Sequence, residues 1–205
     1  MSTASVSKQK ECHAPAAPRQ SARDRIFNAA RQLFYKNGIR AVGVESIASE
    51  AQTTKMSLYR SFSCKDELVT EYLRESVREY WDWFDEIVAK HPGDPRAALQ
   101  TIFDSQASKA CTCDTRGCAI GNASVELTEP DHPARQVVTE FNQEKLTRLT
   151  ALCAQAGYQD PAALARGLFL LMDGAYMSLL SLGSTGPTSA LPQAARAMME
   201  AHPRL

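Results

Sequence analysis

Residues 44–65, VESIASEAQTTKMSLYRSFSCK, decide how this chain of 205 residues folds. A short helix is predicted over residues 44–51, where apolar side chains recur at the spacing of one helix face. These side chains are Val44, Ile47, Ala48 and Ala51. A second short helix is predicted over residues 55–62, because Thr54 is a favourable N-cap. The stretch therefore predicts two short helices that meet at a tight turn.

A longer helix precedes this pair. Ser21 followed by Asp24 is similar to a capping box, which marks the start of a helix. Asn37-Gly38 marks its end, since glycine adopts the left-handed conformation that helix ends favour. The apolar stripe between them consists of Ile26, Ala29, Ala30, Leu33 and Phe34. Residues 21–65 are thus predicted to form a three-helix unit.

The outer face of the second short helix is polar and basic. A short helix braced by another helix can enter the major groove of DNA, with base contacts near its start and phosphate contacts beside it. The candidate DNA-binding residues are Thr54, Lys55, Ser57, Tyr59, Arg60 and Lys65. On the residues alone, a plain three-helix corner with a solvated basic face explains the pattern equally well.

Charge is divided unevenly along the chain, although the formal net charge is zero. Residues 1–65 contain 11 Lys and Arg against 4 Asp and Glu, whereas residues 66–205 contain 12 against 19. A basic unit on an acidic body fits a module that binds a polyanion. Residues 1–20 have no apolar period, so we expect a flexible basic arm there.

Residues 38–69, GIRAVGVESIASEAQTTKMSLYRSFSCKDELV, resemble the N-terminal domain of the TetR family of transcriptional regulators. The matching positions are Ile47, Ala48, Leu58, Tyr59, Phe62, Lys65 and Leu68. The resemblance implies an all-α fold, in which a three-helix domain with a helix-turn-helix is joined to a larger helical domain for ligand binding and dimerisation. It also implies a double-stranded DNA operator, a homodimer and a small-molecule effector.

Three positions depart from the family pattern. Gln52 stands where the turn usually has glycine, and a non-glycine residue with positive φ costs roughly 1 kcal/mol. Gly43 replaces the threonine that usually caps the first short helix. Ser63-Cys64 replaces Pro-Ser and places a thiol close to the predicted DNA-facing surface.

The rest of the chain is predicted to form a helical body. We expect a flexible arm over residues 1–20, a helix-turn-helix domain over 21–65, and an effector-binding and dimerisation domain over 66–205. A long helix over residues 66–90 joins the head to the body, and its wide apolar face predicts burial. Asp94-Pro95 and Asp160-Pro161 each combine an N-cap with a proline in the first turn, so both mark helix starts.

The helix after Pro161 carries apolar side chains on two faces. Residues 162–182 are about long enough to cross a bilayer, but Arg166 and Asp173 interrupt the run. A helix with two apolar faces needs two partners, and a second copy of the chain is the simplest second partner. We therefore expect a homodimer. We also expect a last helix over residues 192–201, and a protein that resides in the cytoplasm without a membrane partner.

Three cysteines lie close together at residues 111–118. Cys111, Cys113 and Cys118 could bind a metal ion, but no fourth ligand is obvious at that spacing. They could also sense redox state or electrophiles through Cys118, provided that Arg116 and a helix start lower its pKa. The third interpretation is a small packed residue at a helix start. RGCAIGNASVEL, residues 116–127, resembles the Gly-Cys helix start of one TetR subgroup, in which the cysteine lies near the effector pocket.

The sequence contains no motif of a catalytic site that we recognise, so we expect a regulator that needs no cofactor and no metal, rather than an enzyme. The leading hypothesis is a homodimeric repressor that a small-molecule effector releases from a palindromic operator. The alternatives are a thiol-based sensor acting through Cys118 with Cys111 or Cys113, and a helical ligand-binding dimer without DNA. Candidate ligand-binding residues are Trp83, Phe84, Phe103, Cys118, Asn122, Phe141, Met172, Asp173 and Tyr176.

Overall fold

The computed structural model describes residues 20–110 and 116–205, with Ala110 described by its backbone alone. These residues form helices and no β-strand, as the sequence predicted. The helices are α1 (Ala22–Asn37), α2 (Val44–Glu50), α3 (Lys55–Ser61), α4 (Lys65–Ala89), α5 (Pro95–Ala110), α6 (Ala119–Glu126), α7 (Pro133–Gln155), α8 (Pro161–Leu182) and α9 (Leu191–Ala201). The expected arm lies outside the described residues, apart from Gln20.

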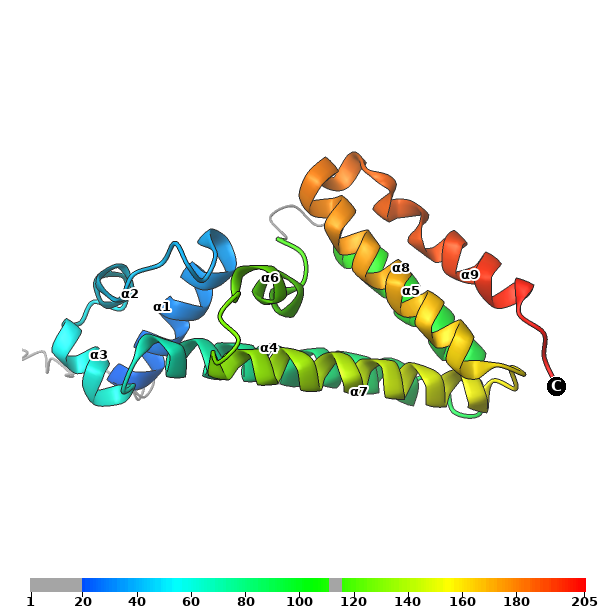
Figure 1. Cartoon of the computed structure of the whole chain (residues 1–205), viewed down its shortest axis with the longest axis horizontal. Coiled ribbons are helices and arrows are strands. Elements are labelled where there is room, and N and C mark those ends of the chain that lie inside the picture. Colours follow the sequence, from blue (N-terminus) through cyan, green and yellow to red (C-terminus); the bar gives the residue numbers. More distant parts are fainter. Residues whose placement is uncertain (1–19, 111–115) are drawn as a thin grey trace, which may run out of the picture.

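The helices form a small head and a longer body (Figure 1). α1, α2 and α3 gather at one end, and α4 runs from them along the length of the molecule beside α7. α5, α8 and α9 cross over the far part of this base, while α6 lies between the head and the crossing helices. The head therefore reaches the body through α4 and α6.

The helix starts follow their capping residues. The Ser21 hydroxyl accepts from the Asp24 backbone, and the Asp24 carboxylate accepts in return, so the capping box is complete. At the other end Gly38 adopts a φ of 92°, a conformation that side chains disfavour. Asp94 and Asp160 cap the starts of α5 and α8 through their carboxylates, at 2.9 Å each.

The turn between α2 and α3 has the shape that the sequence predicted. Gln52 has a φ of 49° and is the one non-glycine residue with positive φ in residues 20–110 and 116–205. Gly43 occupies the N-cap of α2 without a side-chain bond, whereas Thr54 caps α3 by accepting from the Ser57 backbone. Phe62 is almost fully buried but extended, so α3 ends one residue earlier than predicted.

Arginines on α1 pair with acids on α4. Arg23 contacts Glu71 at 2.5 Å, and Arg31 contacts Glu79 at 2.6 Å. Hydrogen bonding to Glu71 raises the pKa of Arg23. Part of the head's excess positive charge is thus neutralised by the body instead of being presented to a polyanion.

α8 is long and apolar enough to cross a membrane by length and composition, but it packs within the bundle against α5, α7 and α9. One face is buried through Leu164, Leu168 and Met172. The opposite face leaves Leu170 and Met177 in solvent, 70% and 55% exposed, while Leu180 and Leu182 are 41% and 59% exposed near the end of the helix. The second apolar stripe predicted from the sequence consists of Phe169, Met172, Tyr176 and Leu180, and all of it except Leu180 is buried or half-buried in the bundle. The apolar side without a partner in the described chain is therefore a different one, formed by Leu170 and Met177.

Candidate DNA-binding surface and ligand cavity

α3 presents a continuous outer face at the tip of the head. Lys55, Met56, Tyr59 and Arg60 are exposed on it, and Thr54 is exposed at its start. Ser57 is half-buried, and its backbone donates to the Thr54 hydroxyl at 3.2 Å. The first two turns of α3 thus offer an ammonium, a phenol and a guanidinium to one neighbouring surface.

Lys55 is held in place by an acid on the preceding helix. Its ammonium donates to the Glu45 carboxylate at 2.9 Å, and this hydrogen bond raises the pKa of Lys55 and lowers that of Glu45. Both side chains are in solvent, so the pair orients Lys55 without adding much stability. A phosphate that contacts Lys55 has to compete with Glu45.

Lys65 differs from the other candidate DNA-binding residues. It is half-buried, and its ammonium donates to the Ile39 carbonyl at 2.7 Å and lies 5.9 Å from the centre of the Phe34 ring. Burial lowers the pKa of this ammonium. Lys65 thus ties the start of α4 to the end of α1, apart from the exposed face of α3.

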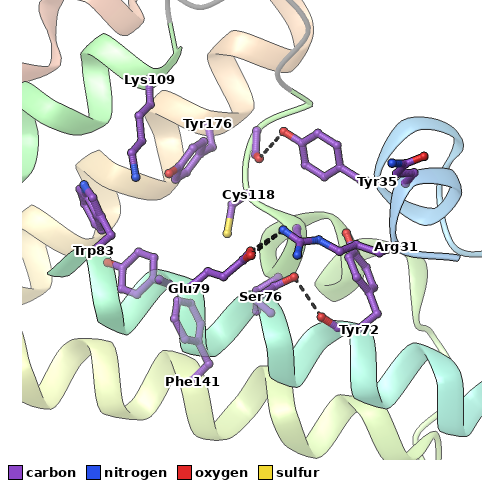
Figure 2. A pocket seen from close by; sticks show the side chains of 15 residues that line it. Arg31, Tyr35, Tyr72, Ser76, Glu79, Trp83, Lys109, Cys118, Phe141 and Tyr176 are labelled. Carbon is purple, nitrogen blue, oxygen red and sulfur yellow. Dashed lines mark hydrogen bonds and ion pairs between the residues drawn. The ribbon is translucent and has the colours of Figure 1, made fainter. Parts of the chain in front are cut away.

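A cavity of about 440 Å³ lies where the head meets the body (Figure 2). Arg31 and Tyr35 of α1 form one wall, and the side chains of α4 form another. The full lining is Arg31, Gln32, Tyr35, Tyr72, Ser76, Glu79, Tyr80, Trp83, Lys109, Gly117, Cys118, Ala119, Ile120, Phe141 and Tyr176. A cavity of this size and aromatic content is typical of small-molecule sites.

Charged side chains lie toward the solvent side of the cavity. The ion pair between Arg31 and Glu79 is partly exposed, and the Lys109 ammonium lies 4.4 Å from the centre of the Trp83 ring. Figure 2 shows Lys109 and Trp83 at one end and Arg31 at the other, with the Cys118 thiol between them. Partial burial lowers the pKa of Lys109.

The interior of the cavity holds neutral polar groups. Burial raises the pKa of Tyr72, Tyr80 and Tyr176, so all three phenols keep their protons at physiological pH. The Tyr80 hydroxyl is buried and has no hydrogen-bond partner among the described residues. Such a group is costly to leave unpaired, which makes it a candidate ligand contact.

Cys118 caps α6, but its thiol is not activated as the sensor hypothesis requires. The thiol accepts from the Gly121 backbone at 3.4 Å, yet burial dominates and raises the pKa of Cys118. The predicted neighbour, Arg116, instead donates to the Tyr35 carbonyl at 3.3 Å. Burial of the helix start thus shifts the pKa of Cys118 in the direction opposite to the one that the thiol-sensor alternative requires. Cys111 and Cys113 lie outside the described residues.

The cavity brings together four of the predicted ligand-binding residues: Trp83, Cys118, Phe141 and Tyr176. Phe84, Phe103 and Met172 lie in the hydrophobic core, each at most 3% exposed, and do not line the cavity. Asn122 donates to the Arg116 carbonyl at 2.8 Å. Asp173 binds the buried Lys145 ammonium at 2.8 Å, so its polar group already has a partner.

α6 connects the cavity to the loop between α1 and α2. The Arg40 side chain donates to the Glu126 carbonyl at 2.6 Å and to the Thr128 hydroxyl at 2.7 Å, and it also pairs with Glu129. At the other end of α6, the Tyr35 hydroxyl accepts from the Arg116 backbone at 3.0 Å. Both ends of this short segment are thus bonded to the head.

The sequence analysis missed several residues of this region. Among them are Arg31, Tyr35, Arg40, Tyr80 and Lys109, which depend on contacts between helices that are far apart in the chain. Charge alone gave no signal, because Arg31 and Arg40 look like any other basic residue of the head. Tyr80 was predicted to be buried, but only the structure shows that its hydroxyl has been left without a described partner.

No group of three or more His, Cys, Asp or Glu side chains that could hold a metal ion occurs within residues 20–110 and 116–205. The three-cysteine arrangement considered from the sequence falls partly outside this range, since only Cys118 is described.

A three-helix head with an exposed recognition helix, fixed to a helical body with a ligand-sized cavity, defines a helix-turn-helix regulator that binds DNA. The family model for bacterial regulatory proteins of the tetR family matches residues 26–72. The crystal structure of SCO4454, a TetR-family transcriptional regulator from Streptomyces coelicolor, is 30% identical, has a TM-score of 0.82 and covers 87% of this chain and 94% of that one. The chain belongs to the TetR family and is a transcriptional regulator, not an enzyme.

Two further relatives of this chain are also transcriptional regulators. The structure of the TetR-type regulator sav143 from Streptomyces avermitilis is 27% identical with a TM-score of 0.76, over 91% of this chain and all of that one. The repressor KstR2 of Rhodococcus jostii is 35% identical over 80 residues, which are 39% of this chain and 39% of that repressor. The full-length likeness therefore comes from the solved structures, and the likeness to KstR2 is local.

Proposed function

We propose that this regulator is a homodimeric repressor, active in the cytoplasm, which leaves a palindromic operator when a small molecule occupies the cavity. The observation that carries this proposal is that Arg31 and Tyr35 of α1 line the same cavity as Trp83, Phe141 and Tyr176 of the body. A bound molecule would therefore touch the DNA-binding head directly.

The contacts of α6 supply a route from the cavity to the recognition helix. A ligand between α4 and the start of α6 would press on Cys118 and Ala119, and α6 is bonded to Arg40 at its other end. In a dimer, the two α3 helices would lie in successive major grooves about 34 Å apart. A ligand that prefers dimer conformations with a different spacing of the two α3 helices would lower the fraction of dimers that fit the operator.

The exposed apolar face of α8 supports the homodimer. Leu170 and Met177 are seven residues apart and lie on one side of the helix, and both are more than half exposed. Burying them against the same face of a second copy would remove apolar area from water at about 25 cal/mol per Å². A two-fold axis at α8 would also place the two heads symmetrically, as a palindrome requires.

Thiol sensing through Cys118 is the weaker alternative. The thiol lines the cavity and could meet an electrophile there, but its raised pKa keeps little thiolate at neutral pH. A reversible, non-covalent effector needs no thiolate and fits the same cavity.

The test is release from the chain's own upstream intergenic DNA. Fluorescence anisotropy with labelled DNA would be followed while apolar aromatic compounds are added to wild-type protein and to Ser76→Trp, which places a large ring in the cavity. An effector should release the wild-type protein and act at least tenfold less well on the variant. Equal release from both, or none by any compound that binds the protein, would contradict the proposal.

A further inference from the structure

The Tyr80 hydroxyl is the feature of the cavity that no contact within the described chain explains. Its ring is fixed by three aromatic neighbours, with centroids 5.0 Å from Trp81, 5.2 Å from Trp83 and 4.8 Å from Phe141. The ring cannot turn freely between these neighbours, so the hydroxyl keeps its direction. The hydroxyl is nevertheless buried without a described partner.

The chemistry of the cavity restricts what could pair with this hydroxyl. Because its pKa is raised by burial, the phenol is neutral and can donate a hydrogen bond to an acceptor. Tyr72 and Tyr176 are neutral for the same reason, and burial likewise favours the neutral thiol of Cys118. A carboxylate that accepted from the Tyr80 hydroxyl would lose its hydration among aromatic rings, whereas an uncharged oxygen would lose much less.

The walls around these groups are aromatic. Trp83, Phe141 and Tyr176 line the cavity together with Tyr72 and Tyr80. Flat rings gain more from such walls than chains do, because ring pairs stabilise each other beyond the area that they bury.

We propose that the effector is an aromatic compound with an uncharged acceptor oxygen, a ketone or another carbonyl, at its buried end, and that this oxygen accepts from the Tyr80 hydroxyl. The proposal rests on the proposed function only in placing the effector in this cavity, and it adds the chemical class. Charged or strongly polar groups of the ligand belong at the solvent side, near Lys109 and the pair of Arg31 and Glu79.

A matched pair of probes tests this contact: 2-acetylnaphthalene, which has a carbonyl, and 2-ethylnaphthalene, which has nearly the same shape without one. Their affinities are measured by calorimetry on the full-length protein without DNA, for wild type and for Tyr80→Phe. Tyr158→Phe is the control, since it removes a phenol hydroxyl from a buried tyrosine that does not line the cavity.

Wild type and Tyr158→Phe should bind the ketone about tenfold more tightly than the hydrocarbon, which is the scale of one hydrogen bond. In Tyr80→Phe the two affinities should agree within about twofold, because the donor is gone. Its melting temperature without ligand should equal or exceed that of wild type, since an unpaired hydroxyl has been removed, and this also shows that the variant folds.

Equal affinities in wild type, a preference for the ketone that persists in Tyr80→Phe, or no binding of either probe would overturn the proposal. DNA release is measured separately, so the two ideas can fail independently. If the ketone binds through Tyr80 but leaves the operator complex intact, the proposed function fails and the ligand class stands. If a compound without an acceptor releases the operator from both wild type and Tyr80→Phe, the proposed function stands and the proposed ligand class fails.

Discussion

Single residues carry much of the strain and chemistry of this regulator. Gln52 holds the turn of the helix-turn-helix at a φ of 49°, a conformation that suits glycine better. Its backbone N–H donates to the Ser49 carbonyl at 3.0 Å, so the turn is fixed by the main chain while the side chain is exposed.

Gln52→Gly is expected to stabilise the protein by about 0.5 kcal/mol, because it removes about 1 kcal/mol of strain and adds about 0.5 kcal/mol of backbone entropy cost. Gln52→Ala keeps the β-carbon and should leave stability unchanged. Urea unfolding followed by circular dichroism measures both. A glycine variant less stable than the alanine variant would mean that the turn is not strained.

The reactivity of the buried thiols Cys118 and Cys153 can be compared with that of the exposed thiol Cys64 in the same protein. Cys64 is exposed, whereas burial raises the pKa of Cys118 and raises that of Cys153 to about 12. The thiolate is the nucleophile that iodoacetamide alkylates, so at pH 8 the reagent should modify Cys64 at least tenfold faster than Cys118 or Cys153. Peptide mass spectrometry over time gives the rates. Modification of Cys118 as fast as Cys64 would revive the thiol-sensor alternative.

Among the elements, α6 shows what sequence reasoning could and could not reach. Its start at Cys118 was predicted from the Gly-Cys resemblance, and the helix of eight residues is there. Its role between head and body was not predicted, because Arg40 and Glu126 are 86 positions apart and neither has a pattern that names the other. Local signals such as the Ser21 capping box and the Thr54 N-cap could be predicted, since each depends on residues within one turn.

The cavity illustrates the same limit. Sequence reasoning placed Trp83, Phe84 and Phe103 among the candidate ligand-binding residues, and all three side chains are buried at least in part. It could not separate a cavity wall from solid core, because both are lined by apolar side chains. Only Trp83 of the three lines the cavity, since its position on α4 faces α5 and α6 across the space.

The contact between α1 and α6 can be tested at Gly38. An added β-carbon there would lie 3.0 Å from the Glu126 carboxylate, and the φ of 92° adds backbone strain. Gly183 has a φ of 68° with an extended ψ and open space around it, so it isolates the backbone effect. Gly38→Ala should therefore cost about 1 kcal/mol more than Gly183→Ala, within the range of about 1–3 kcal/mol for such strain. Equal costs by urea unfolding would mean that α6 yields freely at this contact.

At the scale of the whole molecule, the proposed dimer explains why α8 is apolar on both sides. Leu170→Glu combined with Met177→Glu would place two charges in the interface, and the protein should sediment as a monomer that remains helical. Val125→Glu changes a side chain on α6 that is 67% exposed and should leave the dimer intact. A double variant that stays dimeric in analytical ultracentrifugation would place the interface elsewhere.

The function proposed for the whole molecule depends on the outer face of α3 reading operator DNA. Lys55 and Tyr59 are the residues on which this claim depends, and Lys90 provides a matched control. Lys90 is exposed and paired with Glu86, as Lys55 is with Glu45, but it lies at the far end of α4. Replacing either lysine by alanine removes one exposed ion pair, so the two variants differ mainly in where the lost charge was located.

The deciding measurement is the dissociation constant for the upstream intergenic DNA, taken at fixed salt for wild type, Lys55→Ala, Tyr59→Ala and Lys90→Ala. Lys55→Ala and Tyr59→Ala should each weaken binding about tenfold without loss of helical content, while Lys90→Ala stays within about twofold. If Lys55→Ala and Tyr59→Ala bind as tightly as wild type, or Lys90→Ala weakens binding as much as they do, α3 is not the reading surface.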